Sequence, residues 1–152
     1  MKRVDGMTAK YYLSQLQLMK SKIKQLQEQK QMYLDRATSI TASFNPVKVQ
    51  TSSTTDKMGD NVTKIVDLDS QIDEEIVYFL EKKHEIINQI HNLDNVFYIQ
   101  ILFKKYVEGK GLKVISKEID LSYAHVRHLH GKALKVFEEM HTKLLNKKEL
   151  IH

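Results

Sequence analysis

Apolar side chains recur at steps of three and four residues along two long stretches of the chain, residues 8–37 and 61–93. Such heptad spacing is typical of helices that pair along a seam, as in a coiled coil. Lys30 occupies one seam position of the first stretch, and Asp69 and Lys83 interrupt the seam of the second. The apolar positions are Tyr12, Leu16, Met19, Ile23, Leu26, Tyr33, Ala37 and Ile40, and then Ile65, Ile72, Ile76, Phe79, Ile86, Ile90 and Leu93.

Residues 38–60 interrupt the apolar pattern between these two stretches. They are rich in Ser and Thr and include Pro46, which lacks a backbone N–H and disfavours helical angles at Asn45. We therefore expect a loop here, and the sequence does not decide whether this loop is ordered. Asn61 is the expected N-cap of the helix that follows.

Charge differs between the two predicted helices. Residues 1–40 hold eight Lys/Arg and three Asp/Glu, a net charge of +5, whereas residues 41–93 hold five and nine, a net charge of −4. Opposite charge favours pairing of the two helices with each other as an antiparallel hairpin. We also expect a homo-oligomer, a dimer or higher, whose size the sequence leaves open.

The C-terminal third predicts three further helices and a tight turn. Residues 95–107 are apolar nearly all round, which indicates a buried helix, with Asp94 as its expected N-cap and Gly109 in left-handed conformation after its end. A short helix starting at residue 111 or 112 presents Leu112, Ile115 and Ile119 on one face and small Ser116 at a close approach. Asp120, Leu121 and Ser122 form the turn, and the next helix directs Val126, Leu129, Ala133 and Phe137 inward.

This layout is that of a helix-turn-helix, whose second helix enters the major groove of DNA. The predicted base-reading side chains on that helix are Tyr123, Ala124, His125, Arg127 and His128, and a DNA-facing role is also expected for His130. Arg127 can pair with guanine through two hydrogen bonds. The predicted phosphate contacts are Lys110, Lys113, Lys117, Ser122, Lys132 and Lys135.

Composition narrows the function classes further. The chain has no Cys, and residues 94–152 hold eleven Lys/Arg, seven Asp/Glu and five His, a basic balance that suits a polyanion partner. His84 opens a zinc-protease-like pattern that has Asn88 in place of the second His. We expect no enzyme, no metal site, no cofactor, no signal peptide and no membrane partner, and a cytoplasmic location in a bacterial host cell.

The C-terminal third resembles region 4 of sigma-70-type factors. The resemblance rests on Glu108-Gly109, Ile115-Ser116, Ile119, Leu121-Ser122, Val126 and Ala133-Leu134. The whole layout is similar to small phage and prophage proteins of Gram-positive bacteria, near the ArpU and RinA types of late-gene transcription regulators. Asp120 departs from the usual Gly of the turn, and Gly131 is unusual inside a recognition helix.

These observations predict an all-α protein with a coiled-coil-like helical hairpin (residues 1–93) and a helix-turn-helix domain similar to sigma region 4 (residues 94–152). The resemblance implies a sequence-specific transcription regulator that binds double-stranded DNA, and it leaves contact with RNA polymerase open. Two alternatives remain, a packaging protein similar to a small terminase subunit and a coiled-coil protein-interaction module.

Overall fold

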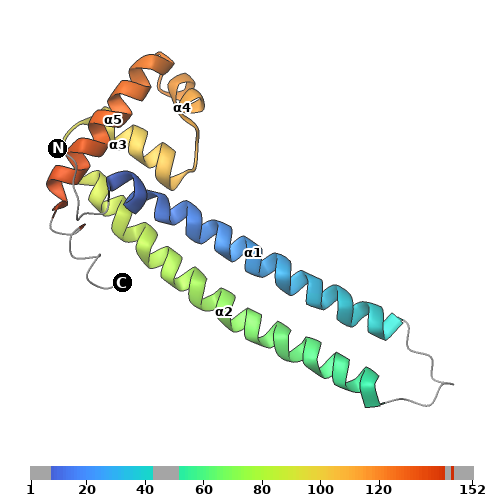
Figure 1. Ribbon diagram of the computed structural model, residues 1–152. Coiled ribbons are helices and arrows are strands. Elements are labelled where there is room, and N and C mark those ends of the chain that lie inside the picture. Colours follow the sequence, from blue (N-terminus) through green and yellow to red (C-terminus); the bar gives the residue numbers. More distant parts are fainter. Residues whose placement is uncertain (1–7, 43–51, 143–144, 146–152) are drawn as a thin grey trace. The chain divides into compact units, whose positions relative to one another are not determined.

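The computed structural model describes residues 8–42, 52–142 and 145 (Figure 1). Two long helices, α1 (Ala9–Ala42) and α2 (Ser52–His91), come first. They are followed by α3 (Val96–Leu102), the π-helical turn η1 (Phe103–Val107), α4 (Leu112–Glu118) and α5 (Tyr123–Met140). The described residues contain no strand, which confirms the all-α prediction. These residues also include no helix that is both long and apolar enough to cross a membrane.

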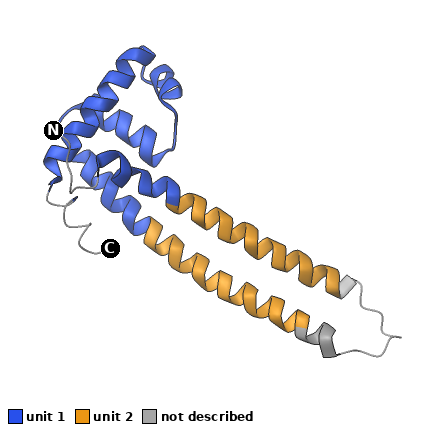
Figure 2. Cartoon of the chain, viewed as in Figure 1, with its two compact units in different colours: residues 1–18, 80–152 blue, residues 19–79 orange. Residues whose placement is uncertain are grey.

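The chain forms two compact units, coloured separately in Figure 2. Unit 1 consists of residues 1–18 and 80–152, and unit 2 consists of residues 19–79. The division therefore falls within both long helices. The predicted boundary between the helical hairpin and the helix-turn-helix domain, at residue 93, is not tested by this division. It stays a prediction.

Both long helices extend further than their sequence pattern predicts. α1 continues to Ala42 and α2 begins at Ser52, so residues 38–42 and 52–60 are helical and not a loop. Asn61 is consequently a buried residue inside α2 and not an N-cap. In the first of these segments the Thr38 hydroxyl bonds back to the preceding turn, where its Oγ1 donates to the carbonyl of Leu34 at 2.9 Å, and such bonds let Thr sit within a helix. The rest of the expected loop, residues 43–51, lies outside the described residues.

Unit 2 is an antiparallel pair formed by parts of α1 and α2. Lys22 bonds to Glu75 at 2.6 Å and Lys30 bonds to Asp69 at 2.5 Å, so the residue number falls along α2 as it rises along α1. The predicted pairing of the two long helices is confirmed. Lys30 and Asp69 are two of the three residues that interrupt the seams, and each compensates the charge of the other. The seam pattern alone does not predict that pairing.

Unit 1 encloses a core to which α1, α2 and α5 contribute. Tyr12, Ile86, Ile90 and Phe137 are completely buried, and the Tyr12 and Phe137 rings lie 6.1 Å apart. At the start of α1, Thr8 Oγ1 accepts a hydrogen bond from the backbone N–H of Tyr11 at 3.2 Å. The four buried side chains, which are aromatic or branched aliphatic and come from three helices, exclude water from the core of unit 1.

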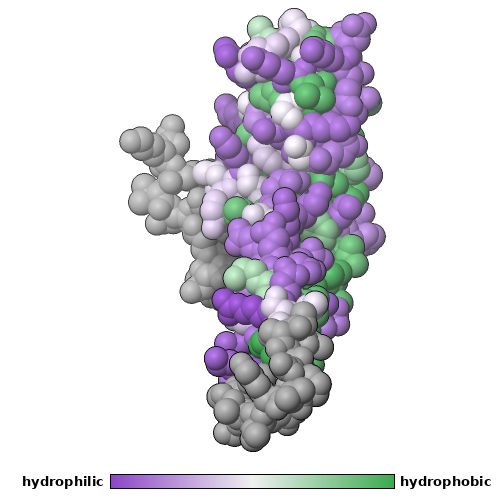
Figure 3. Space-filling model, turned by 90° about the vertical axis from the view of Figure 1, so that its right-hand side faces the viewer, coloured by the Kyte–Doolittle hydropathy of each residue, from purple (hydrophilic) through white to green (hydrophobic). Residues whose placement is uncertain are grey.

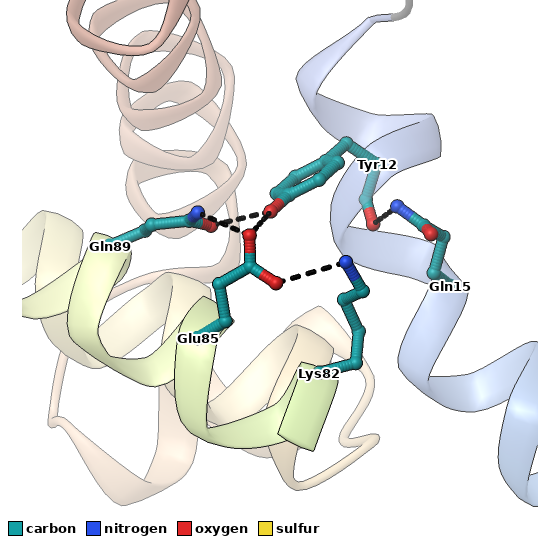
Figure 4. Close-up of polar contacts among 5 residues, drawn as sticks. All are labelled: Tyr12, Gln15, Lys82, Glu85 and Gln89. Carbon is teal, nitrogen blue, oxygen red and sulfur yellow. Dashed lines mark hydrogen bonds and ion pairs between the residues drawn. The ribbon is translucent and has the colours of Figure 1, made fainter. Parts of the chain in front are cut away.

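A buried polar cluster lies beside this core (Figure 4). The Tyr12 hydroxyl donates to Gln89 Oε1 at 2.7 Å, Gln89 Nε2 donates to Glu85 Oε1 at 3.3 Å, and Lys82 Nζ donates to Glu85 Oε2 at 2.9 Å. Burial is the main cause that raises the pKa of Tyr12 to about 12. The chain of bonds keeps the polar ends of these side chains satisfied, which a buried polar group requires.

The helix after α2 differs in two details from its prediction. Its N-cap is Asn95 and not Asp94, since Asn95 Oδ1 accepts from the backbone N–H groups of Phe97 and Tyr98 at 2.9 and 3.2 Å. Its first turn is not buried, because Val96 and Phe97 are exposed. Ile101, near the end of the helix, is buried. Only one side of α3 packs, and the run of apolar residues overestimates its burial.

Candidate nucleic-acid interface

The connection between α4 and α5 has the backbone geometry that its residues predict. Asp120 has a φ of +58°, the left-handed conformation that Asp adopts more readily than most residues. The backbone N–H of Leu121 then bonds to the carbonyl of Ser116 at 3.0 Å. Ser122 caps α5, because its Oγ accepts from the backbone N–H of His125 at 3.1 Å. The predicted turn and cap are both confirmed.

A small apolar core holds α3, α4 and α5 together. Ile101, Ile115 and Val126, one from each helix, are completely buried. The partly buried side chains that pack around them are Leu112, Ile119, Leu121 and Leu129. The inward faces predicted for α4 and α5 are therefore correct, and the opposite face of α5 is left to solvent.

That solvent face holds all five predicted base-reading residues, each of them exposed: Tyr123, Ala124, His125, Arg127 and His128. Three basic and aromatic side chains gather at the first turn of α5. The Arg127 guanidinium carbon and the Lys113 Nζ each lie 5.8 Å from the centre of the Tyr123 ring. Cations at this distance from an aromatic face are attracted to it, so Tyr123 holds the two cations near one another.

The predicted phosphate contacts fall into two groups. Lys113, Lys117, Ser122, Lys132 and Lys135 are exposed. Lys110 differs, because its Nζ bonds to Glu108 and to Glu118, each at 2.7 Å. These bonds raise the pKa of Lys110, with Glu108 the larger cause, and the bond from Lys110 is the main cause that lowers the pKa of Glu118.

This ion-pair cluster fixes the segment between η1 and α4. Lys104 also donates to Glu118, at 3.3 Å, so one carboxylate holds two lysines. Lys110 already has two anionic neighbours within the chain, and its charge is less available to a phosphate than that of Lys113. A sequence pattern that counts lysines does not reveal which of them are already paired.

His130 differs from the histidines with which the sequence groups it. Its ring stacks on Tyr106 with centroids 5.7 Å apart, and the Tyr106 hydroxyl lies 2.8 Å from its Nε2. Burial is the main cause that lowers the pKa of His130, and burial raises the pKa of Tyr106 to about 12. The predicted DNA-facing role does not fit this environment, because the ring packs against η1 while His125 and His128 are exposed.

The turn after η1 is set by α1 as well as by its own residues. Gln17 Nε2 donates to the carbonyl of Tyr106 at 3.2 Å. Gly109 has a φ of +75°, as predicted, and a Cβ there would lie 2.9 Å from Gln17 Oε1. Both the backbone angle and this close approach require glycine at that position.

The histidines of α2 have local partners. His84 Nε2 lies 3.2 Å from Asn88 Nδ2, and the His91 ring stacks on Phe103 with centroids 6.1 Å apart. Within residues 8–42 and 52–142, no group of three or more His, Asp or Glu is arranged to hold a metal ion.

Comparison of the chain with protein-family models, with curated proteins and with solved structures finds no match. The resemblance to sigma region 4 therefore stays a prediction that rests on the quoted residues.

Proposed function

We propose that this protein is a sequence-specific DNA-binding regulator of transcription, with the first half of α5 as its reading helix. The observation that carries the proposal is the group of Lys113, Tyr123 and Arg127 at the capped, exposed start of α5. A guanidinium held on an aromatic ring has lost part of its freedom before it binds, which lowers the entropic cost of recognition. The packed core beneath α5 supplies a rigid base for these side chains.

The exposed residues divide by the role that their chemistry permits. Arg127 is suited to the O6 and N7 acceptors of guanine, and Ala124 presents a methyl group of a size that can contact thymine. Lys113, Lys117, Lys132 and Lys135 are suited to phosphates, where each neutralised charge adds a salt-dependent contribution to affinity. Ser122 keeps its cap bond and can also approach a phosphate.

The regulatory setting is proposed on the resemblance alone. The quoted residues of the C-terminal third favour a phage or prophage transcription regulator similar to sigma region 4. Contact with RNA polymerase belongs to the same proposal. The direction of regulation, activation or repression, is left open.

The test begins with selection of bound sequences from random duplex DNA by the full chain. Affinity for the selected site is then measured by fluorescence anisotropy across a series of salt concentrations. Arg127→Ala should weaken binding by about 1–3 kcal/mol and relax the preference at one base pair. Lys132→Ala should weaken binding to all duplexes alike and reduce the salt slope by about 1.

Lys57→Ala is the matched control, because it removes an exposed lysine of α2 in unit 2 and should leave affinity unchanged. Equal binding of the wild type to every duplex at moderate salt would exclude sequence-specific reading. A closed ring of eight or more copies, measured by light scattering, would instead favour the packaging alternative. Unchanged mobility of every nucleic acid tried would favour the interaction module.

A further inference from the structure

A row of exposed valines lies along α2 in unit 2. Val62, Val66 and Val77 share one side of the helix with Asp69 and Asp73, at steps of four, three, four and four residues. The three valines are 51%, 60% and 56% exposed. We call these five residues the valine face. Figure 3 shows the general setting, in which hydrophobic residues interrupt a largely hydrophilic surface.

The seam of unit 2 is also only partly covered. Leu68 and Ile72 are buried, but the other seam residues remain partly exposed: Met19, Ile23, Leu26, Tyr33, Ala37, Ile40, Ile65, Ile76 and Phe79. Two paired helices can shield only one side of each other, whereas a bundle of four helices encloses its seams. Unit 2 therefore leaves apolar area in water that further helices could cover.

The charges of α1 and α2 in unit 2 indicate which kind of helix could pack against them. In unit 2, residues 19–42 hold five Lys/Arg and two Asp/Glu, while residues 57–79 hold two and six. The ion pairs of Lys22 and Lys30 use two of these charges on each helix. Five further charged residues make no ion pair with a described residue: Lys20 and Lys24 on α1, and Asp67, Asp73 and Glu74 on α2. A surplus of each sign lies on a separate helix of the same chain.

We infer that unit 2 pairs with unit 2 of a second copy, with the valine face of each copy packed against α1 of the other. A second copy supplies both a basic helix for the acidic one and an acidic helix for the basic one. In a two-fold pair with parallel hairpins, α1 meets the other copy's α2 antiparallel and in the register of Lys22 with Glu75 and Lys30 with Asp69. That register brings Lys24 level with Asp73, and Leu34 between the levels of Val62 and Val66.

Leu34 supports this register, because it is an exposed apolar residue of α1 at the height where the valine face needs one. Leu34 of one copy then contacts the Val62 and Val66 end of the valine face of the other, and Lys24 meets Asp73 within the same interface. The inference concerns unit 2 alone and does not depend on DNA binding.

Sedimentation of the full chain over a range of concentrations tests the pairing. The wild type should reach the mass of two copies, and the double variant Val62→Lys with Val66→Lys should raise the dissociation constant at least about tenfold. Val96→Lys is the matched control, because Val96 is a valine of unit 1 that is exposed to a similar extent, at 64%, and it should leave the constant unchanged. Both variants change exposed side chains, and circular dichroism should show unchanged helix content.

A wild type that stays monomeric at its highest soluble concentration would overturn the inference. So would a double variant with the dissociation constant of the wild type, or a mass well above two copies. A mass of two copies that is lost equally in Val96→Lys would also overturn it, because the interface would then lie outside the valine face.

Charge reversal tests the register separately. Lys24→Glu or Asp73→Lys alone should weaken self-association by about two- to tenfold, since two partly exposed ion pairs are lost in each dimer. A mixture of the two variants should form heterodimers in preference to either homodimer, because both pairs are then again of opposite charge. Statistical mixing of the two variants would overturn the pairing of Lys24 with Asp73.

Discussion

The same apolar pattern of α1 is fully buried in one unit and only partly buried in the other. In unit 1, Tyr12 and Leu16 are 0% and 1% exposed, whereas Ile23 and Leu26 on the same side of the helix in unit 2 are only partly buried. α2 repeats this contrast, because Ile86 and Ile90 are 0% exposed whereas Ile65 and Ile76 are only partly buried. A third helix makes the difference, since Phe137 of α5 packs with Tyr12 in unit 1.

The comparison teaches that a heptad pattern predicts pairing but does not predict burial. Two helices turn their apolar sides toward each other wherever the pattern persists. Complete exclusion of water needs atoms on the remaining sides of the seam. Unit 1 obtains them within the chain, and we propose that unit 2 obtains them from a second copy.

The largest expected effect comes from a matched pair of leucines on α1. Leu16→Ala should lower the free energy of unfolding by about 3 kcal/mol, because it empties space in a closed core. Leu26→Ala should cost below about 1.5 kcal/mol in the monomer, because less apolar area returns to water. Urea unfolding of both variants at low protein concentration measures the two losses. Equal losses would contradict the difference in burial between the units.

A smaller effect is expected from the polar cluster of unit 1. Tyr12→Phe keeps the ring beside Phe137 but removes the donor to Gln89 Oε1, and a buried acceptor without its donor costs about 1–3 kcal/mol. Gln25→Leu on α1 in unit 2 is the control, because Gln25 is exposed and should tolerate the change. Unchanged stability of Tyr12→Phe would show that the cluster contributes nothing to the closure of unit 1.

Substitution of two exposed helical glycines should change the stability by a similar or smaller amount. A Cβ at Gly131 in α5 or at Gly59 in α2 would meet nothing within 4 Å. Alanine at either position should stabilise its helix by up to about 1 kcal/mol. Hydrogen exchange should then slow in unit 1 for Gly131→Ala and in unit 2 for Gly59→Ala. Slower exchange across both units in each variant would show that the two units unfold together.

The smallest effect concerns pH and is confined to unit 1. The pKa of His130 is lowered by burial first and by the charges of Lys105 and Lys10 second, so the folded chain binds this proton less readily than the unfolded chain. Stability should be complete above the unfolded value of about 6.5 and decrease as pH falls through the lower folded pKa. His130→Gln should flatten this slope in thermal unfolding, and His125→Gln, at an exposed position, should not. An unchanged slope in His130→Gln would mean that other groups cause the dependence of stability on pH.

The local features of the candidate interface could be predicted from single residues. Gly109, Asp120 and Ser122 determine backbone angles and a cap through their own chemistry, and the structure has each of them as expected. The pairing states of Lys110 and His130 could not be predicted, because Glu118 and Tyr106 reach them only after the chain has folded. The boundaries of α1 and α2 were wrong where Ser and Thr favour a loop locally but helix packing continues.

The sequence by itself determined the helical class, the inward faces of α4 and α5, and the turn between them, because these depend on periodicity and on the angles that a residue prefers. The tertiary structure decided which part of each long seam is closed, which lysines are already paired, and how Lys30 and Asp69 compensate each other. These outcomes depend on neighbours that are distant along the chain. Burial and charge pairing are properties of such neighbours and not of the local pattern.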